Sequence, residues 1–210
     1  MKTSGCKILI IFFAAFSLAS CSAIISGEKG QVQAPPVPLS CIAVLPATTS
    51  VGDEERINYE HAKMLETGAK YVDTLLQQEL ATHSKVRLLS SSQLDNLIPE
   101  VEGGLSGAYA RIGQKINCDG VLITTVSRFK QREGSSMAAE SPASAEFRMV
   151  LRHSGNGAVL WSADFQETQD SFLMNIFSYS KMQRQGFRWL SVEQLMEQGV
   201  SQRIAECPYL

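Results

Sequence analysis

Apolar residues recur along this chain at two spacings, and each spacing predicts one kind of secondary structure. A compact apolar run at 41–46 ends in Pro46 and predicts a short buried strand, because proline cannot donate to a sheet ladder. The next segment places apolar residues three and four positions apart, which predicts a long helix with one buried face. These helix positions are Leu65, Ala69, Val72, Leu76 and Leu80. A second short strand is expected at 86–89.

Two shorter helices are expected before the next strand. The first would begin at Ser92, which has Asp95 three positions later as in a capping box, and would end at Leu97. The second would be capped by Ser106, after a glycine-rich break that lacks the lysine of a phosphate-binding loop. Its apolar side would carry Tyr109, Ile112 and Ile116.

Alternation of apolar and polar residues dominates the chain after residue 119. The segment at 120–126 predicts a strand that begins buried on both faces and becomes solvated towards its end. A flexible hairpin tip is expected at 134–144, a return strand at 146–152, and a last strand at 159–165 after an Asn-Gly turn signal. We expect these three strands to form an antiparallel meander.

Two further helices are expected near the C-terminus. The first, at about 171–183, would present Phe172, Leu173, Ile176 and Phe177. The second would begin at Ser191, where Gln194 completes a capping box. Its apolar stripe is assigned to core packing and consists of Val192, Leu195, Met196, Val200 and Ile204.

The order of these elements predicts an α/β fold with a mixed five-stranded sheet. A strand, a long helix and a second strand form a right-handed crossover, which requires parallel pairing, and the meander adds antiparallel strands. Helices would pack on the sheet, and the helices near the C-terminus would be additions to this arrangement. We expect a single α/β domain at 41–210.

The first twenty residues predict a cleaved leader. Lys2 and Lys7 accompany an apolar run at 8–16 that is too short to span a bilayer core of about 30 Å. The sequence at 18–21 resembles the bacterial lipoprotein box, which implies a signal peptide at 1–20 and lipid, including palmitate, on Cys21. A lipidated tether would follow at 21–40. Since Ser22 is not aspartate, the resemblance implies the periplasmic face of the outer membrane of a Gram-negative bacterium.

Charge and cysteine content narrow the functional classes. The leader contains two of the 19 Lys and Arg and none of the 21 Asp and Glu, so the mature chain has 17 bases and 21 acids. Nucleic acid is therefore not an expected partner. Cys41, Cys118 and Cys207 remain after processing, and they permit at most one intramolecular bridge. Their spacing matches no metal motif, so neither a metal nor a cofactor is expected.

No catalytic signature is present in the chain, and we expect a protein that is not an enzyme. His61, His83 and His153 lie at predicted helix and strand ends, outside any hydrolase or metalloprotease motif. We therefore assign no catalytic residue.

Two groups of residues are candidates for contact with a partner. Arg128, Lys130 and Arg132 would form a basic ribbon, together with Arg148 and Arg152 on the return strand. The alternative is a solvated hairpin, because glutamates lie nearby and surface ion clusters are weak. The second group is the bulky patch of Phe187, Arg188 and Trp189. Trp and Arg are favoured at interface centres, although a tryptophan between helices is also typical of a core.

Several core and turn segments resemble one envelope superfamily. They lie at 42–46, 86–89, 112–113 and 119–122. Their residues and their order resemble the core and turn positions of the TolB amino-terminal and curli-secretion-lipoprotein superfamily, which includes lipoprotein activators of penicillin-binding proteins. The resemblance covers about 41–165 and implies a related fold.

The resemblance implies a lipid-anchored periplasmic accessory protein that acts through protein–protein contacts in assembly, secretion or wall synthesis. Its partner is unknown, and self-association is left open. One alternative is an oligomeric secretion-channel subunit, although the ribbon at 127–146 is more polar than a lipid-facing strand. The other alternative is a periplasmic hydrolase assembled from scattered residues.

Overall fold

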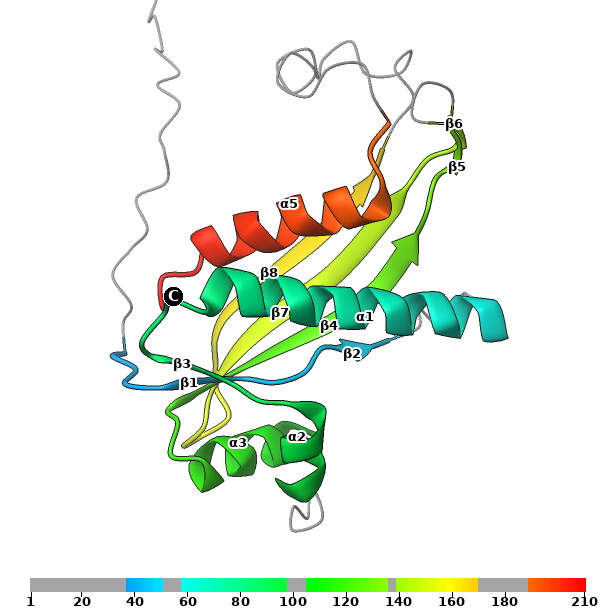
Figure 1. Ribbon diagram of the computed structural model, residues 1–210. Helices are drawn as coiled ribbons and strands as arrows, with labels where there is room; N and C mark the ends of the chain where they lie inside the picture. The colour runs from blue at the N-terminus through cyan, green and yellow to red at the C-terminus, as the bar shows by residue number, and fades with distance from the viewer. Residues whose placement is uncertain (1–36, 51–57, 98–104, 136–138, 170–188) are drawn as a thin grey trace, which may run out of the picture. The chain divides into compact units, whose positions relative to one another are not determined.

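The computed structural model describes residues 37–50, 58–97, 105–135, 139–169 and 189–210. The main sheet has six strands, in the order β3-β1-β4-β7-β8, with β2 pairing beside β4 off this path (Figure 1). Its strands are β1 (Ile42–Val44), β2 (Thr48–Thr49), β3 (Val86–Leu88), β4 (Gly120–Lys130), β7 (Ser144–His153) and β8 (Val159–Thr168). The helices are α1 (Tyr59–Leu80), α2 (Ser91–Leu97), α3 (Leu105–Lys115) and α5 (Val192–Ala205).

The predicted fold class is confirmed. β1 pairs in parallel with β3 and with β4, whereas β4, β7 and β8 pair antiparallel in sequence order. The five strands on the main path are the five predicted strands. The sixth strand, β2, was not predicted because it is only two exposed threonines after Pro46, too short to show an alternating pattern. A separate pair, β5 (Glu133–Gly134) with β6 (Ala139–Ser141), lies in the predicted hairpin tip.

Helices α1 and α5 cover one face of the sheet. The five helix positions predicted from the spacing of apolar residues are all buried, as is the predicted stripe of α5. The close contact of α5 with β8 depends on Gly199, because a Cβ there would meet the ring of Phe165 at 2.8 Å. The same holds for α1, where a Cβ at Gly68 would lie 2.7 Å from Phe129.

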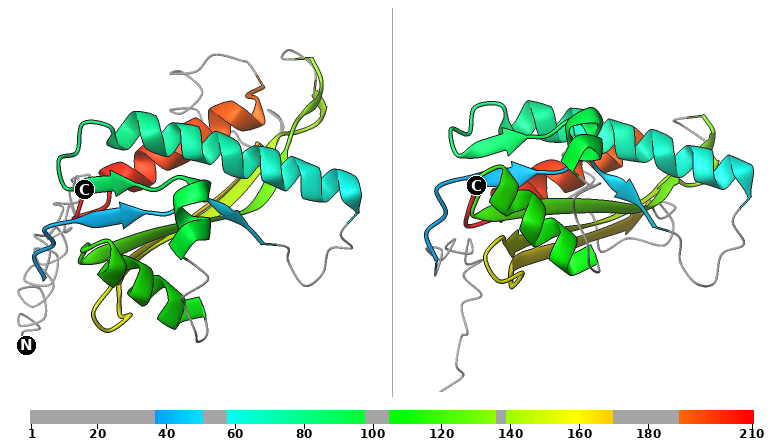
Figure 2. Two further views of the ribbon diagram at one scale, coloured as in Figure 1. Left: turned by 60° about the horizontal axis from the view of Figure 1, so that its bottom comes forward. Right: turned by 90° about the horizontal axis from the view of Figure 1, so that it is seen from below.

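Helices α2 and α3 lie on the opposite face, over one end of the sheet (Figure 2). A second, smaller core joins them to β1 and the first half of β4. Its fully buried members include Ala43, Ile112 and Val121. As a result, β4 begins between two helical layers and, within the described residues, ends with only one. No helix in the described part of the chain is long and apolar enough to cross a membrane.

The caps of α2 and α3 differ from the prediction. Ser90, rather than Ser92, caps α2: the Gln93 N–H donates to the Ser90 hydroxyl at 3.3 Å, and the Ser90 N–H donates to the Gln93 side chain at 2.9 Å. The observed capping box pairs Ser90 with Gln93 and begins two residues before the predicted pair of Ser92 with Asp95. Ser106 lies inside α3, which begins at Leu105, rather than at the position before the helix. The predicted capping box at Ser191 is confirmed, and the helix expected at 171–183 lies outside the described residues.

Among the cysteines that the structure describes, Cys41 and Cys118 form a disulfide, and Cys207 is a buried free thiol. The bridge connects the residue before β1 to the turn before β4. It therefore joins two neighbouring parallel strands that are 77 residues apart in the sequence. The sequence had left the pairing open among three cysteines.

Removal of this bridge should destabilise the domain substantially. Closing a loop of 77 residues lowers the entropy of the unfolded chain by an amount equivalent to about 4.5 kcal/mol in the chain-entropy model. We expect the Cys41→Ser/Cys118→Ser variant to lose free energy of unfolding of that order, measured by urea denaturation with tryptophan fluorescence. Wild-type protein in reductant should match the variant, and Cys207→Ser should retain the sensitivity to reductant. Equal stability of oxidised and reduced wild-type protein would contradict this account.

Candidate functional site

The described chain enters the domain beside the start of β4 and is held there by several contacts. The carbonyl of Cys41 accepts hydrogen bonds from the N–H groups of Asp119 and Gly120, both at 3.0 Å. The Asp119 carboxylate accepts from the Ser40 N–H at 2.7 Å and also from the Ser40 hydroxyl. Leu39 is buried, and a Cβ at Gly120 would lie 2.9 Å from its side chain. We call residues 39–41 with Asp119 and Cys118 the entry clasp.

Hydrogen bonds in the entry clasp favour the ionised form of the Asp119 side chain. The hydroxyl and the N–H of Ser40 stabilise the carboxylate and hold the pKa of Asp119 below its usual range, and nearby His153 acts in the same direction. His153 is the last residue of β7 and lies opposite Gly120 in the sheet. The clasp is therefore at its strongest when the carboxyl group is ionised.

The opposite end of β4 carries a different group of contacts. The strand β4 has eleven residues, so its ends at Gly120 and Lys130 lie about 34 Å apart. Beyond the strand, Gln131 binds the start of α5: its side-chain amide donates to Glu193 at 3.0 Å and its carbonyl accepts from the Val192 N–H at 3.2 Å. Arg132 donates to the Trp189 carbonyl at 3.1 Å. We call this region, residues 130–135 and 139–141 with Trp189, the distal tip.

The structure brings together two of the predicted contact groups. Arg132 from the ribbon and Trp189 from the bulky patch are hydrogen-bonded neighbours, although 57 residues separate them in the sequence. Phe187 and Arg188 lie outside the described residues. Lys130 is exposed, whereas Arg132 and Trp189 are half-buried. Sequence reasoning had treated the two groups separately because nothing in the spacing indicates this contact.

Most arginines of the predicted ribbon have a partner within the sheet. Arg128 forms an ion pair with Glu146 at 3.2 Å, directly across the strand pair. Arg148 forms two bonds to Asp164 on β8, one of them 3.2 Å long. Arg152 donates to the Gly157 carbonyl at 3.0 Å. Acids therefore neutralise Arg128 and Arg148, whereas the partner of Arg152 is a neutral carbonyl. Exposed basic charge persists towards the distal tip at Lys130.

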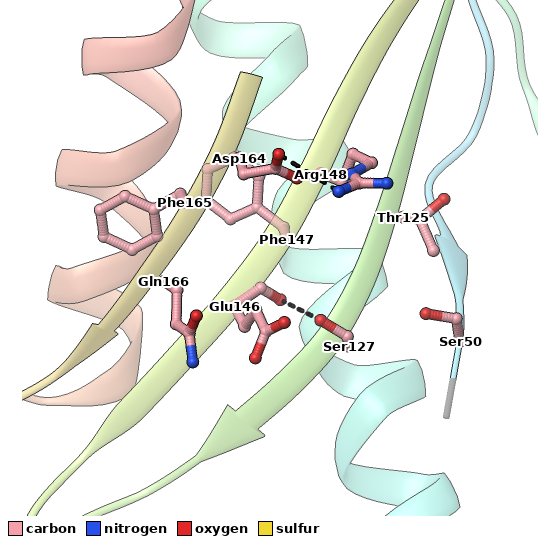
Figure 3. Close-up of a pocket in the computed structure, with 9 residues that line it drawn as sticks. All are labelled: Ser50, Thr125, Ser127, Glu146, Phe147, Arg148, Asp164, Phe165 and Gln166. Atoms are coloured by element: carbon pink, nitrogen blue, oxygen red, sulfur yellow. Dashed lines mark hydrogen bonds and ion pairs between the residues drawn. The ribbon is translucent and has the colours of Figure 1, made fainter. Parts of the chain in front are cut away.

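A polar hollow of about 630 Å³ lies between these two ends, on the face of the sheet away from α1 and α5 (Figure 3). It is lined by Ser50, Thr125, Ser127, Glu146, Phe147, Arg148, Asp164, Phe165 and Gln166. The ion pair of Arg148 with Asp164 crosses it. A hydrated outer face of this kind is common in antiparallel sheets. Among the described residues, no cluster of histidine, cysteine and acidic side chains could hold a metal ion.

Three described side chains that could act as a nucleophile or a base, Ser40, His153 and Cys207, are either engaged in hydrogen bonds or buried. The Ser40 hydroxyl donates to a carboxylate, and His153 accepts a hydrogen bond from the Gly155 N–H at 2.9 Å. Burial raises the pKa of the Cys207 thiol, which disfavours the reactive thiolate. These contacts give no support to the hydrolase alternative at these residues.

The geometry defines an α/β domain with a mixed sheet, helices on both faces at one end, and a hairpin that extends at the other. Neither a protein-family model nor a curated protein sequence matches the chain. The resemblance to the TolB amino-terminal and curli-secretion-lipoprotein superfamily therefore stays a prediction.

Several solved structures follow a similar path. A PelC dodecamer from Paraburkholderia phytofirmans is 12% identical with a TM-score of 0.45, and the match covers 83% of this chain and 92% of that one. The LpoB C-terminal domain from Salmonella enterica is 18% identical with a TM-score of 0.40, covering 66% and 90%. Lipoprotein GNA1162 from Neisseria meningitidis is 13% identical with a TM-score of 0.39, covering 69% and 95%. These similarities are distant and carry no conclusion about function.

The entry clasp predicts a specific dependence of stability on pH. Because folding lowers the pKa of Asp119, its contribution to stability is complete above the unfolded value of about 4 and is lost as the pH falls through the lower folded value. Wild-type protein should therefore exceed Asp119→Asn in free energy of unfolding at pH 7, and the difference should narrow at pH 3. Ser40→Ala removes the hydroxyl that contributes most to the shift and should reproduce part of the effect. A difference between wild type and Asp119→Asn that stays constant from pH 7 to pH 3 would rule this out.

Proposed function

We propose that this protein is a lipid-anchored accessory protein of the cell envelope, on the periplasmic face of the outer membrane, that acts by binding another envelope protein. The processes it would serve are assembly, secretion or wall synthesis. The lipoprotein-box resemblance at 18–21 and the proline-rich segment at 34–38 support the anchor and the tether. Two acyl chains or more on Cys21 would hold the domain at a bilayer essentially permanently.

The observation that carries the proposal is the position of the entry clasp and the distal tip at opposite ends of β4. A domain held at residues 39–41 would extend its long strands away from the point of attachment. The distal tip would then stand about 34 Å beyond the clasp, where it meets other envelope proteins first. This arrangement favours contact through the distal tip over contact through the helices beside the clasp.

The chemistry of the distal tip also supports a protein partner. Lys130, Gln131 and Glu133 are exposed there, and Trp189 is half-buried beside Arg132. Aromatic and arginine side chains surrounded by polar residues are typical of the centre and rim of a protein interface. Phe187 and Arg188 immediately precede Trp189 in the sequence and belong to the proposed contact.

A photo-crosslinking side chain at the distal tip should capture the partner in intact cells. We expect a crosslinker in place of Glu133 to give a discrete adduct that mass spectrometry identifies as another envelope protein. A crosslinker in place of Glu66, which is exposed on α1, is the matched control and should give no such adduct. Lys130→Glu should reduce the adduct several-fold, whereas the same charge change at exposed Lys70 should not. Equal capture from both crosslinker positions would contradict the proposal.

A substitution that removes the lipid anchor should leave the folded domain intact. Cys21→Ser removes the sulfur that would carry the lipid, so radiolabelled palmitate should label the wild type and not the variant. The variant should leave the outer-membrane fraction for the soluble periplasm and keep the same urea midpoint. Palmitate labelling of Cys21→Ser, or its retention with the outer membrane, would disprove the proposed anchor.

A further inference from the structure

The two edges of the main sheet differ greatly in length. β3 forms one edge with three residues, whereas β8 forms the other with ten residues and contains no proline. Among the described residues, no strand pairs with the outer side of β8. A long edge strand presents a row of backbone N–H and C=O groups that can bind another strand. β8 is thus a template for further pairing.

The hydrogen-bond pattern shows which residues of β8 are available. The Gln169 N–H donates to the Ala143 carbonyl at 3.1 Å, just beyond the pairing of Ser144 with Thr168. In an antiparallel pair, hydrogen-bonded residues alternate with residues whose backbone groups point the other way. The odd-numbered residues Ala163 and Phe165 therefore bond to β7. The even-numbered residues direct their backbone groups to the open edge, and they include Ser162, Asp164 and Gln166.

We propose that a second copy of this chain binds this edge, with the two β8 strands antiparallel about a two-fold axis at Ala163. In this register Ser162 lies opposite Asp164 of the second copy, and both have backbone groups directed at the edge. Antiparallel pairing of one strand with itself is symmetric, so it forms a closed dimer and covers the ten-residue edge of β8 in both copies. The proposal does not depend on the lipid anchor. Because β4 and β8 run parallel within one copy, the two distal tips of this dimer point in opposite directions, so the position of the tip argued above applies to the single copy.

Side-chain placement favours a second copy in this register. Trp161 would lie opposite Phe165 of the second copy, on the face that α5 covers. Phe165 already stacks on Phe147 with ring centroids 5.1 Å apart, so each new pair would extend an aromatic row across the dimer. Trp161 is half-buried in the single copy and would be covered.

The charges of β8 also permit pairing with itself. The strand has two acids and no base, so two copies would ordinarily repel each other. However, Asp164 is bonded to Arg148 of its own sheet and would face Ser162. Glu167 would face Val159, which is 51% exposed, at the far end of the pairing. No acid therefore lies directly opposite another acid.

The helices would also fit at this spacing. α5 packs over β7 and β8, and in the dimer the two copies of α5 would be separated by the width of about two strands. With strands about 4.8 Å apart, this distance is about 10 Å, which is the usual separation of packed helices.

A proline substitution tests the backbone contacts directly. In Ser162→Pro the missing N–H belongs to the open edge, so the intramolecular ladder with β7 should survive, as edge prolines generally allow. The dimer would lose two symmetric hydrogen bonds, and its dissociation constant should rise by at least about 10-fold. Sedimentation equilibrium of the full-length protein in density-matched detergent measures this constant. Ser162→Ala keeps the N–H and is the matched control, which should dimerise like the wild type.

Cysteine crosslinking tests the register. Ala163→Cys would place two thiols at the two-fold axis, within the Cα separation of 4.4–6.8 Å that a disulfide needs, and should give a covalent dimer on mild oxidation. Gln166→Cys would place its two thiols about 20 Å apart and should not crosslink. Native Cys207 is buried, and Cys41 is bonded to Cys118.

Three results would overturn the proposal. The first is a wild-type protein that sediments as a monomer at all concentrations. The second is a dimer that Ser162→Pro leaves unchanged although circular dichroism shows a native fold. The third is equal crosslinking through Ala163→Cys and Gln166→Cys.

Discussion

The burial of β4 is the constraint on which the rest of this structure depends. Its first five residues are buried, between α1 on one face and the smaller core of α2 and α3 on the other. Further along, only the side chains directed at α1 and α5 stay buried, and Lys130 at the end is exposed. One strand therefore changes from a central strand with two covered faces to a strand with one covered face and one wet face. That change in covering determines where along β4 polar groups reach solvent.

A single irregularity in β4 keeps this arrangement consistent with the sequence. Simple alternation from Leu122 would direct Arg128 and Lys130 into the core. The register with β7 shifts between Val126 and Arg128, so that Phe129 faces the core and Arg128 pairs with Glu146 on the outer face. A bulge adds one residue to one strand and exchanges its two faces beyond that point. Without it, burying Arg128 would cost more free energy than burying Phe129 gains.

The elements were predictable from the sequence to a large extent, because burial on one or two faces leaves a periodic pattern. The long helix, the five main strands and the capping box at Ser191 all follow from such patterns. What could not be predicted depends on contacts between distant residues: the choice of Cys41 and Cys118 for the bridge, and the bond from Arg132 to Trp189. The neutralised ribbon is an intermediate case. Glu146 and Asp164 are evident in the sequence, but their place opposite arginines depends on the register of the strands.

The candidate site shows the same contrast between local sequence patterns, which were predictable, and contacts between distant residues, which were not. The lipoprotein-box resemblance and the ribbon are local features, and they led to the anchor and to part of the distal tip. The entry clasp was not predicted, although 119–122 is among the core and turn segments of the resemblance, because the role of Asp119 depends on Ser40, which is 79 residues away. In the proposed function, the clasp receives any pull from the tether and the distal tip receives the partner. They lie at opposite ends of β4, so a force between them would act along the strand and load its ladder of hydrogen bonds together rather than one after another. The disulfide at Cys41 further prevents β1 from separating from β4 at the point where that force enters.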